Sequence, residues 1–339
     1  MTQKSIVFTE KNKAELLCEP MPEPKPGEVL VKLVRSTISS GTERACLTGD
    51  PNVSIARPAS TVARFPRRVG YSSSGIVAAV GEGVTSLKVG DRVGTWGTKH
   101  SLYNCISERN AVKLDDSIGF DEAALWYIAS FSMQAVRKTN IEVGESAIVM
   151  GVGVLGMMAI KLLRVCGAVP LIAVDPVPEK RELALKLGAD FAFDPFEEGF
   201  ALKVREVTGG GANAAIEVTG NGKALAGVLD CMARFGRVAL LGCTRSSDFT
   251  IDYYHKVHGP GIQLIGAHNT VRPTSDSYHG MWTNRDDILA LNKLVNLGRL
   301  ELASVVDEVH SPEEAPEVFT RLANNPAFPV VQFDWTLLD

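Results

Sequence analysis

The sequence predicts an α/β protein of two domains, in which a β-rich amino-terminal domain precedes a doubly wound parallel sheet. Two patterns predict this. Short alternating apolar and polar segments at 28–34, 75–81 and 91–94 lie between turns, as expected of strands. From Asn140 onward, apolar strand-like runs alternate with helical periodicity, which indicates parallel strands joined by helical crossovers.

The second domain is expected to hold six strands in one parallel sheet, because six apolar runs have the length and flanking turns of buried strands. These runs lie near 146–150, 171–174, 190–193, 214–218, 237–241 and 262–265. A helix over 286–298 and a closing strand over 329–333 are predicted beyond them.

Composition excludes several classes of function. The chain has 339 residues, 45% of them apolar, which suffices to bury two cores. A net charge of −4 gives no basic surface for nucleic acid. No apolar run reaches the roughly 18 residues of a membrane span, and the amino terminus lacks a signal peptide's apolar core, so we expect a cytoplasmic protein. The six cysteines form no CxxC pair, which argues against disulfides and a cysteine-rich zinc lobe.

A glycine-rich turn joins the first strand of the predicted sheet to the next helix. Gly151 allows the sharp turn, Gly153 leaves room for a pyrophosphate, and Gly156 lets the helix pack closely on the strand. The free N–H groups near Val154 and Leu155 would bind the phosphates at the positive end of the helix. The pattern therefore indicates a dinucleotide site.

An acidic residue, Asp175, ends the second strand at the spacing that such a site requires. Its carboxylate would accept hydrogen bonds from both hydroxyls of the adenine ribose and repel the extra phosphate of NADP. The sequence thus favours NAD, although Lys180 and Arg181 are cations that could reach a 2′-phosphate unless they face solvent.

Three more strand ends are expected at the same edge of the sheet, where ligands bind in doubly wound folds. The cofactor-binding candidates there are Thr219, Gly242, Cys243, Gly266, Ala267 and His268.

Four further motifs, at 26–32, 40–43, 81–84 and 89–93, precede the glycine turn. In this order they resemble the medium-chain dehydrogenase/reductase superfamily, of zinc-type alcohol dehydrogenase-like proteins, over almost the whole chain. The resemblance implies a GroES-like catalytic domain with an inserted Rossmann domain, a cleft between them, and a homodimer through the Rossmann sheet edges, or a tetramer. The implied limits are 1–140 with 270–339 for the catalytic domain and 141–269 for the Rossmann domain.

The chain departs from the zinc-dependent members at their metal ligands. Ser40 stands where the family has a cysteine, and Gly70-Tyr71-Ser72 stands where it has Gly-His-Glu. The third ligand falls on Tyr127 or Ile128, depending on the alignment, and Cys105 is the only cysteine in the stretch of the structural zinc lobe. A catalytic zinc needs three thiolate, imidazole or carboxylate ligands, so no metal is expected.

Other groups must then handle the proton of the alcohol. Ser40 and Tyr71 replace two ligands, Thr42 resembles the family's proton-relay hydroxyl, and Glu43 matches the acidic residue that follows it. Tyr71 is the main catalytic candidate, because a phenol can donate to a carbonyl oxygen, or take a proton when a nearby cation lowers its pKa. The alternatives are that Tyr71 only shapes the pocket and that Glu43 pairs with an arginine.

Several other side chains are candidates for the site. Ser132 resembles the small hydroxyl that packs on the nicotinamide face, and His100 is expected to be structural. The pocket candidates, for most of which packing is the alternative, are Trp96, Trp126, Tyr127 and His268.

The leading hypothesis is a zinc-independent, NAD-linked oxidoreductase that acts on a small-molecule secondary alcohol or ketone, such as a sugar or cyclitol. One alternative is an NAD(P)H-dependent enone or quinone reductase, which needs no metal. The other is a dinucleotide-binding protein without catalysis.

Overall fold

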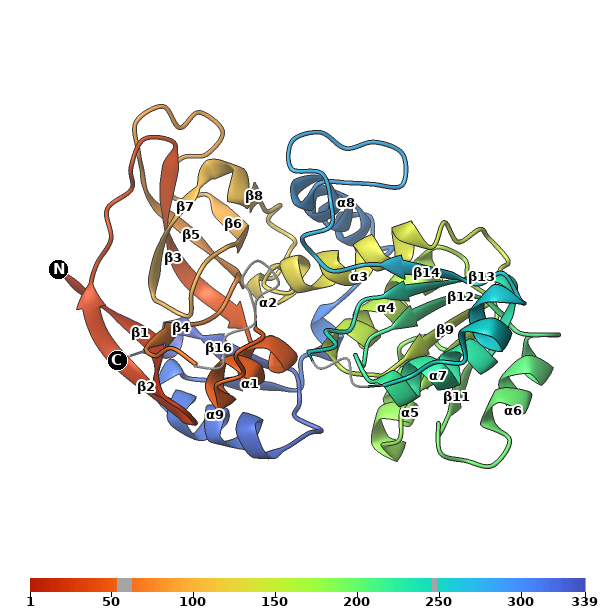
Figure 1. Cartoon of the computed structure of the whole chain (residues 1–339). Coiled ribbons are helices and arrows are strands. Elements are labelled where there is room, and N and C mark those ends of the chain that lie inside the picture. Colours follow the sequence, from red (N-terminus) through yellow and green to blue (C-terminus); the bar gives the residue numbers. More distant parts are fainter. Residues whose placement is uncertain (54–62, 246–248, 339) are drawn as a thin grey trace. The chain divides into compact units, whose positions relative to one another are not determined.

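The computed structural model describes residues 1–53, 63–245 and 249–338 of the chain (Figure 1). It divides into two compact units, one of residues 1–128 and 288–339 and one of residues 129–287. The chain passes between the units within two helices, α3 (Trp126–Lys138) and α8 (Asn284–Asn296). The division therefore falls inside helices, whereas the limits implied by the family resemblance fall at 140/141 and 269/270.

The second unit is built on a six-stranded sheet with the order β11-β10-β9-β12-β13-β14, in which all neighbouring strands are parallel. This confirms the predicted doubly wound sheet. Its strands are β9 (Ala147–Met150), β10 (Leu171–Val174), β11 (Phe191–Phe193), β12 (Ala212–Glu217), β13 (Met232–Leu240) and β14 (Gln263–Gly266). Its crossover helices are α4 (Val154–Val165), α5 (Pro178–Lys186), α6 (Phe200–Val207) and α7 (Gly222–Asp230).

Strands β9 and β10 are buried at every residue, because helices cover a parallel sheet on both faces. Ile148, Ile172 and Val238 form part of one core cluster with apolar side chains of α6 and α7. This rigid sheet holds the carboxyl ends of its strands at one edge.

The first unit is β-rich, as predicted. A three-stranded sheet has the order β2-β1-β4, and a seven-stranded sheet has the order β15-β16-β3-β5-β6-β8, with β7 paired to β3. The first strands are β1 (Thr2–Glu10), β2 (Lys13–Pro20), β3 (Glu28–Thr37), β4 (Arg67–Arg68), β5 (Ser72–Val80) and β6 (Arg92–Trp96). The others are β7 (Tyr103–Ser107), β8 (Ala111–Lys113), β15 (Glu308–His310) and β16 (Val331–Asp334), and the helices are α1 (Ser40–Thr48), α2 (Phe120–Ala123) and α9 (Ala315–Asn324).

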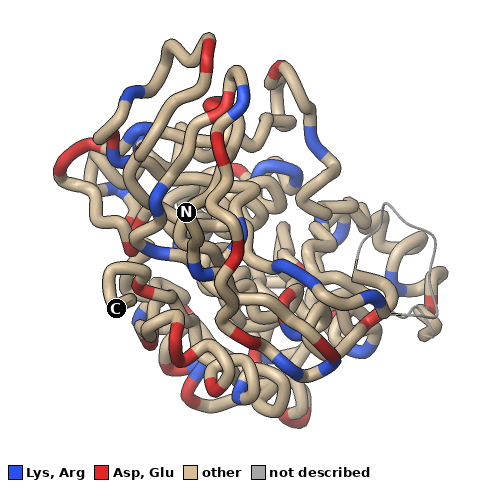
Figure 2. Tube along the Cα trace, turned by 90° about the vertical axis from the view of Figure 1, so that its left-hand side faces the viewer, with Lys and Arg blue, Asp and Glu red and all other residues tan. Residues whose placement is uncertain are grey.

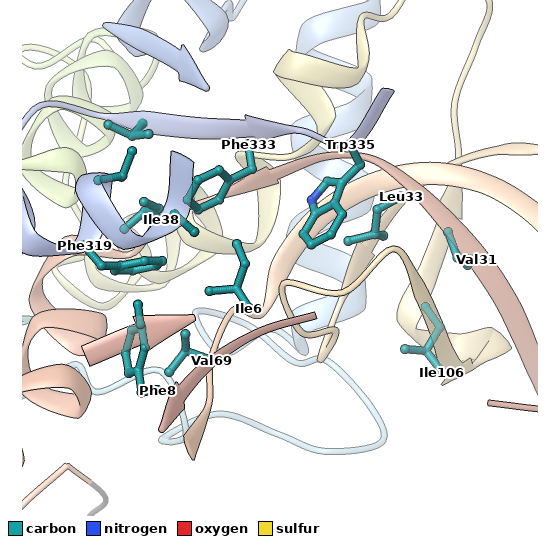
Figure 3. Close-up of a cluster of buried hydrophobic side chains, with 14 of the residues drawn as sticks. Ile6, Phe8, Val31, Leu33, Ile38, Val69, Ile106, Phe319, Phe333 and Trp335 are labelled. Atoms are coloured by element: carbon teal, nitrogen blue, oxygen red, sulfur yellow. The ribbon is translucent and has the colours of Figure 1, made fainter. Parts of the chain in front are cut away.

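Aromatic side chains from the two ends of the chain pack with aliphatic ones in the core of this unit (Figure 3). Phe8 of β1 meets Phe319 of α9 edge to face, with ring centroids 4.8 Å apart. Phe333 and Trp335 complete the cluster from β16 and the turn after it. The carboxyl-terminal segment is thus part of the β-rich unit.

Charged residues of both signs are interspersed along the described chain (Figure 2). Among the described residues, no helix combines the length and the apolar character that crossing a bilayer requires.

Candidate active site

The glycine turn between β9 and α4 has the geometry that the sequence indicates. Gly151 has a φ of 102°, and a Cβ built there would lie 2.9 Å from the Thr219 methyl. A Cβ on Gly156 would lie 1.9 Å from the Gly151 carbonyl oxygen, so only glycine allows the helix this close. A Cβ on Gly153 would meet no atom within 4 Å, which leaves open space at the first turn of α4.

Asp175 is fixed at the carboxyl end of β10 and is only 6% exposed. Its Oδ2 accepts the Val152 N–H of the glycine turn at 2.9 Å, and its Oδ1 accepts the Val177 N–H at 2.9 Å. Each carboxylate oxygen can accept a further hydrogen bond, so both remain able to bind a ribose hydroxyl.

Glu217, a residue that our sequence reasoning missed, organises the end of β12. Its side chain is 2% exposed and accepts the N–H of Thr219 at 2.8 Å and that of Gly220 at 3.1 Å. Burial raises the pKa of this carboxyl, and its hydrogen bonds to Thr219 and Gly220 act the other way. The signal was present, because a charged residue at the end of an apolar strand is unusual.

Gly242, two residues after the end of β13, lies against the turn that follows β12. A Cβ on Gly242 would lie 2.2 Å from the Gly220 nitrogen, so the two strand ends touch through backbone alone. The neighbouring Cys243 is exposed. The structure therefore brings Thr219, Gly242 and Cys243 together at the end of β12, with Thr219 against Gly151 of the glycine turn.

The remaining cofactor candidates lie in the same unit. Ser132 is fully buried and donates to the Leu155 carbonyl oxygen at 2.7 Å, which ties α3 to the first turn of α4. The Gly266 carbonyl oxygen accepts from Lys138, and Ala267 is buried.

His268 is partly exposed, and its Nδ1 accepts the Thr270 N–H at 3.3 Å and lies 2.8 Å from the Thr270 hydroxyl. Burial lowers the pKa of His268, and the positive charge of Arg245 adds to this effect. Because Nδ1 accepts the Thr270 N–H, the ring carries a proton on Nε2.

In the β-rich unit, a cluster of hydroxyls surrounds Tyr71. The phenol donates to the hydroxyl of Ser39, the residue that precedes α1, and hydrogen-bonds with Thr42 as well. Burial raises the pKa of Tyr71, and the charge of Glu43 adds to this, whereas the two hydrogen bonds lower it. The phenol is therefore a proton donor at neutral pH. Sequence reasoning placed Ser40 beside Tyr71, but the hydroxyl that it meets is that of Ser39.

Glu43 lies behind this cluster and is 1% exposed. Its Oε1 accepts the Ser39 N–H at 2.9 Å, and its Oε2 lies 3.0 Å from Nε2 of the buried His100. The other ring nitrogen lies 2.8 Å from the Ser36 hydroxyl, which accepts the Trp335 indole N–H at 2.8 Å. The partner of Glu43 is thus a histidine and not the arginine that we considered, and His100 is structural, as expected.

The approach of Tyr71 to this network depends on Gly70. This glycine has a φ of 96°, and a Cβ there would lie 2.7 Å from the His100 backbone nitrogen. A side chain at residue 70 would therefore push the Tyr71 segment away from His100.

Aromatic rings lie next to the hydroxyl cluster. Tyr127 meets Tyr71 edge to face at 5.5 Å and stacks on Trp96 at 6.3 Å with an interplanar angle of 12°. Ile128 is fully buried, so Tyr127 is the residue at the third ligand position that faces Tyr71. Trp126, a pocket candidate, is 1% exposed and packs on Gly94, which leaves it little surface for a substrate.

Ser72 occupies the position of the glutamate in the Gly-His-Glu motif and is also fully buried. Its hydroxyl donates to the Ala124 carbonyl oxygen at 2.7 Å, and the Thr37 hydroxyl donates to the same oxygen at 2.9 Å. Both bonds anchor the turn before α3, and therefore the segment that carries Tyr127.

The residues at the family's three zinc-ligand positions lack the chemistry of zinc ligands. Ser40, Tyr71 and Tyr127 offer neither a thiolate, an imidazole nor a carboxylate. In the described part of the chain, no three His, Cys, Asp or Glu side chains lie close enough together to hold a metal ion. The residues at the three positions do not fit the metal.

Comparison with known proteins agrees with this fold. Residues 25–140 match the family described as alcohol dehydrogenase GroES-like domain, and residues 154–278 match the family described as zinc-binding dehydrogenase. The chain is 30% identical over 238 residues to a (R,R)-butanediol dehydrogenase from Bacillus subtilis, covering 62% of this chain and 69% of that protein. It is 25% identical over 255 residues to a D-guloside 3-dehydrogenase from Escherichia coli, covering 74% of this chain and 72% of that protein.

Among solved structures, an alcohol dehydrogenase from Escherichia coli complexed with NADH has the same fold, with a TM-score of 0.82 at 16% identity, covering 98% of this chain and 99% of that one. The chain belongs to the zinc-type medium-chain dehydrogenase/reductase superfamily, a superfamily of oxidoreductases.

Proposed function

We propose that this protein is a zinc-independent, NAD(H)-dependent dehydrogenase that transfers a hydride between nicotinamide and a secondary alcohol or its ketone, on a sugar or cyclitol. The observation that carries the proposal is Asp175, a buried acid hydrogen-bonded to the glycine turn. The resemblance to D-guloside 3-dehydrogenase supports a sugar-like substrate.

The nucleotide-binding residues support NAD as the cofactor. The open space at Gly153 and the first turn of α4 suit a pyrophosphate, and Asp175 suits the two ribose hydroxyls. An acid at this place disfavours the 2′-phosphate of NADP. Bound NADH would supply the hydride.

Tyr71 is proposed to handle the proton. In the direction of reduction, its phenol turns the Oη proton from the Ser39 hydroxyl to the carbonyl oxygen of the ketone and donates it there, while the carbonyl carbon receives the hydride. The resulting phenolate accepts hydrogen bonds from the Ser39 and Thr42 hydroxyls until water returns the proton. Oxidation of the alcohol follows the reverse path, with Tyr71 as the base.

Glu43 and His100 are proposed to position this donor. Glu43 holds the Ser39 backbone, so the hydroxyl that receives Tyr71 has a defined place. This arrangement gives the chain a proton donor where the zinc-dependent members have metal ligands. The substitutions at Ser40, Tyr71 and Tyr127 support a reaction without zinc.

The experiment that tests the function is a turnover panel. Purified protein is assayed with NAD+ and NADP+ on secondary alcohols, sugars and cyclitols, and with NADH and NADPH on ketones, enones and quinones. We expect turnover of a sugar-like alcohol with NAD+ and no stoichiometric zinc by metal analysis. Turnover of enones alone would favour the reductase alternative, and NADH binding without turnover would favour a binding protein. Stoichiometric zinc in active enzyme would refute the zinc-free claim.

We further propose a homodimer formed through the edge of the parallel sheet. Strand β14 is the last strand of that sheet, and its Leu264 is 40% exposed. Light scattering should give twice the chain mass, and a monomer at assay concentration would contradict the proposal.

A further inference from the structure

Arg181 of α5 is held against the turn that carries Asp175. Its Nη1 donates to the Asp175 carbonyl oxygen at 2.8 Å and to the Pro176 carbonyl oxygen at 2.9 Å. The same nitrogen lies 3.3 Å from Oδ2 of Asp194, and the Arg181 side chain is 22% exposed. A guanidinium therefore lies next to the residue whose carboxylate is proposed to bind the ribose.

Asp194 comes directly after β11, the neighbour of β10 in the sheet. Its Oδ1 accepts the Phe196 N–H at 2.9 Å, which fixes the orientation of the carboxylate. The other oxygen, Oδ2, faces Arg181. The carboxylate is thus built into the turn and is not a loose surface charge.

The position of this guanidinium matters because arginine is the side chain that most readily binds phosphate, through charge and a planar set of donors. An unrestrained Arg181 beside Asp175 would be able to pair with the 2′-phosphate of NADP. The two carbonyl oxygens instead accept from Nη1, and the negative charge of Asp194, 3.3 Å from the same nitrogen, offsets that of the guanidinium.

We propose that Asp194 is a positioning residue for cofactor selectivity, which keeps Arg181 from binding a 2′-phosphate and so strengthens the preference of the site for NAD. This inference rests on the proposed NAD site and adds a residue to it. Asp175 would reject the phosphate directly, whereas Asp194 would act through Arg181.

The test measures binding and not turnover, by calorimetric titration with NADH and NADPH. The variants are Asp194→Asn, Asp175→Ser, the double variant that carries both, and the triple variant that adds Arg181→Gln. Asparagine keeps an oxygen for the Phe196 N–H but loses the charge. Because the carboxylate of Asp175 would itself repel the 2′-phosphate and mask any gain in NADPH affinity, the comparison is made in the Asp175→Ser background. There, Asp194→Asn should tighten NADPH binding about fivefold, as for one partly exposed guanidinium–phosphate contact, and change NADH binding less than twofold.

Adding Arg181→Gln should remove that gain, because the effect of Asp194 passes through the guanidinium. The inference is overturned if NADPH binding is unchanged by Asp194→Asn, or if the gain persists without Arg181. Asp194→Ser, whose hydroxyl can accept the Phe196 N–H, replaces Asp194→Asn if the latter does not fold. If the variants bind NADH but show no change in NADPH binding, only this inference is contradicted. A wild-type protein that binds neither nucleotide contradicts the proposed function as well.

Discussion

The substitution Tyr71→Phe separates a catalytic phenol from one that only fills space. It removes the Oη atom, and with it the hydrogen bonds to Ser39 and Thr42. The ring stays, together with its edge-to-face contact with Tyr127. A fall in turnover that the loss of stability does not explain therefore reports on the phenol proton.

The expected magnitude follows from what Oη does in each role. A positioned general acid contributes about 10² to 10⁴ in rate, and we expect the lower end because Tyr71 is partly exposed and water can substitute as a donor. The ratio kcat/KM should thus fall about 100-fold, equivalent to about 2.7 kcal/mol. Loss of the two neutral hydrogen bonds should lower the free energy of unfolding by about 2 kcal/mol, with a change of about 2–4 °C in Tm for each kcal/mol.

The assay is steady-state ketone reduction by NADH, with thermal unfolding of each variant in parallel. Because burial raises the pKa of Tyr71, the phenol keeps its proton as the pH rises, and it should cause no loss of reduction rate below about pH 10. Tyr103→Phe removes a phenol from β7, outside the hydroxyl cluster, and serves as the matched control. A change of less than about threefold in kcat/KM, or about 0.6 kcal/mol, would refute the catalytic role and leave Tyr71 as a residue that shapes the pocket.

Three further substitutions test other parts of the structure. Burial raises the pKa of Glu122 from 4.5 to about 7, although hydrogen bonds from the N–H groups of Leu302 and Ala303 lower it. The free energy of unfolding should therefore fall as the pH rises from about 4.5 to about 7. Glu122→Gln should abolish this fall and should be more stable than wild type above about pH 7, by up to about 3 kcal/mol. Identical urea unfolding curves of the wild type at pH 5 and pH 8 would contradict this prediction. Glu43→Ala leaves a buried histidine N–H and a backbone N–H without their acceptor, and chemical unfolding should show a loss of about 3 kcal/mol, with Glu43→Gln losing less. Gly156→Ala places a methyl 1.9 Å from a carbonyl oxygen, so calorimetry should show at least about tenfold weaker NADH binding, and wild-type affinity would argue against the close helix packing.

The parallel sheet could be predicted from the sequence because its strands are continuous apolar runs between turns. The run 171–174 coincides with β10, and those near β9, β11 and β14 begin or end within one residue of the strand. Strand β13 begins at Met232, five residues before the predicted run at 237. Its first residues include the exposed Phe235, which has a φ of 64°, so this part of the strand lacks an apolar pattern.

The candidate active site could be predicted only in part. Tyr71 was found because it replaces a metal ligand in a recognisable motif, but its partner Ser39 was not, since the direction of a side chain before a helix depends on the local backbone. His100 lies 57 residues from Glu43 in the sequence, and such pairs form only in the tertiary structure. The choice between Tyr127 and Ile128 also required the structure, because adjacent residues point about 100° apart around a helix.

The hydrogen bond from Ser72 to the Ala124 carbonyl oxygen bears on any attempt to engineer a metal enzyme from this scaffold. Reinstating the Gly-His-Glu motif would place a carboxylate at residue 72, in a fully buried position, beside an oxygen that now receives two hydroxyl protons. The acid would meet a lone pair instead of a donor, and the carbonyl would lose one of its two partners. Ligand grafting at residues 40 and 71 alone would leave both hydrogen bonds in place, whereas completing the motif with a glutamate at residue 72 would require the turn before α3 to be rebuilt first.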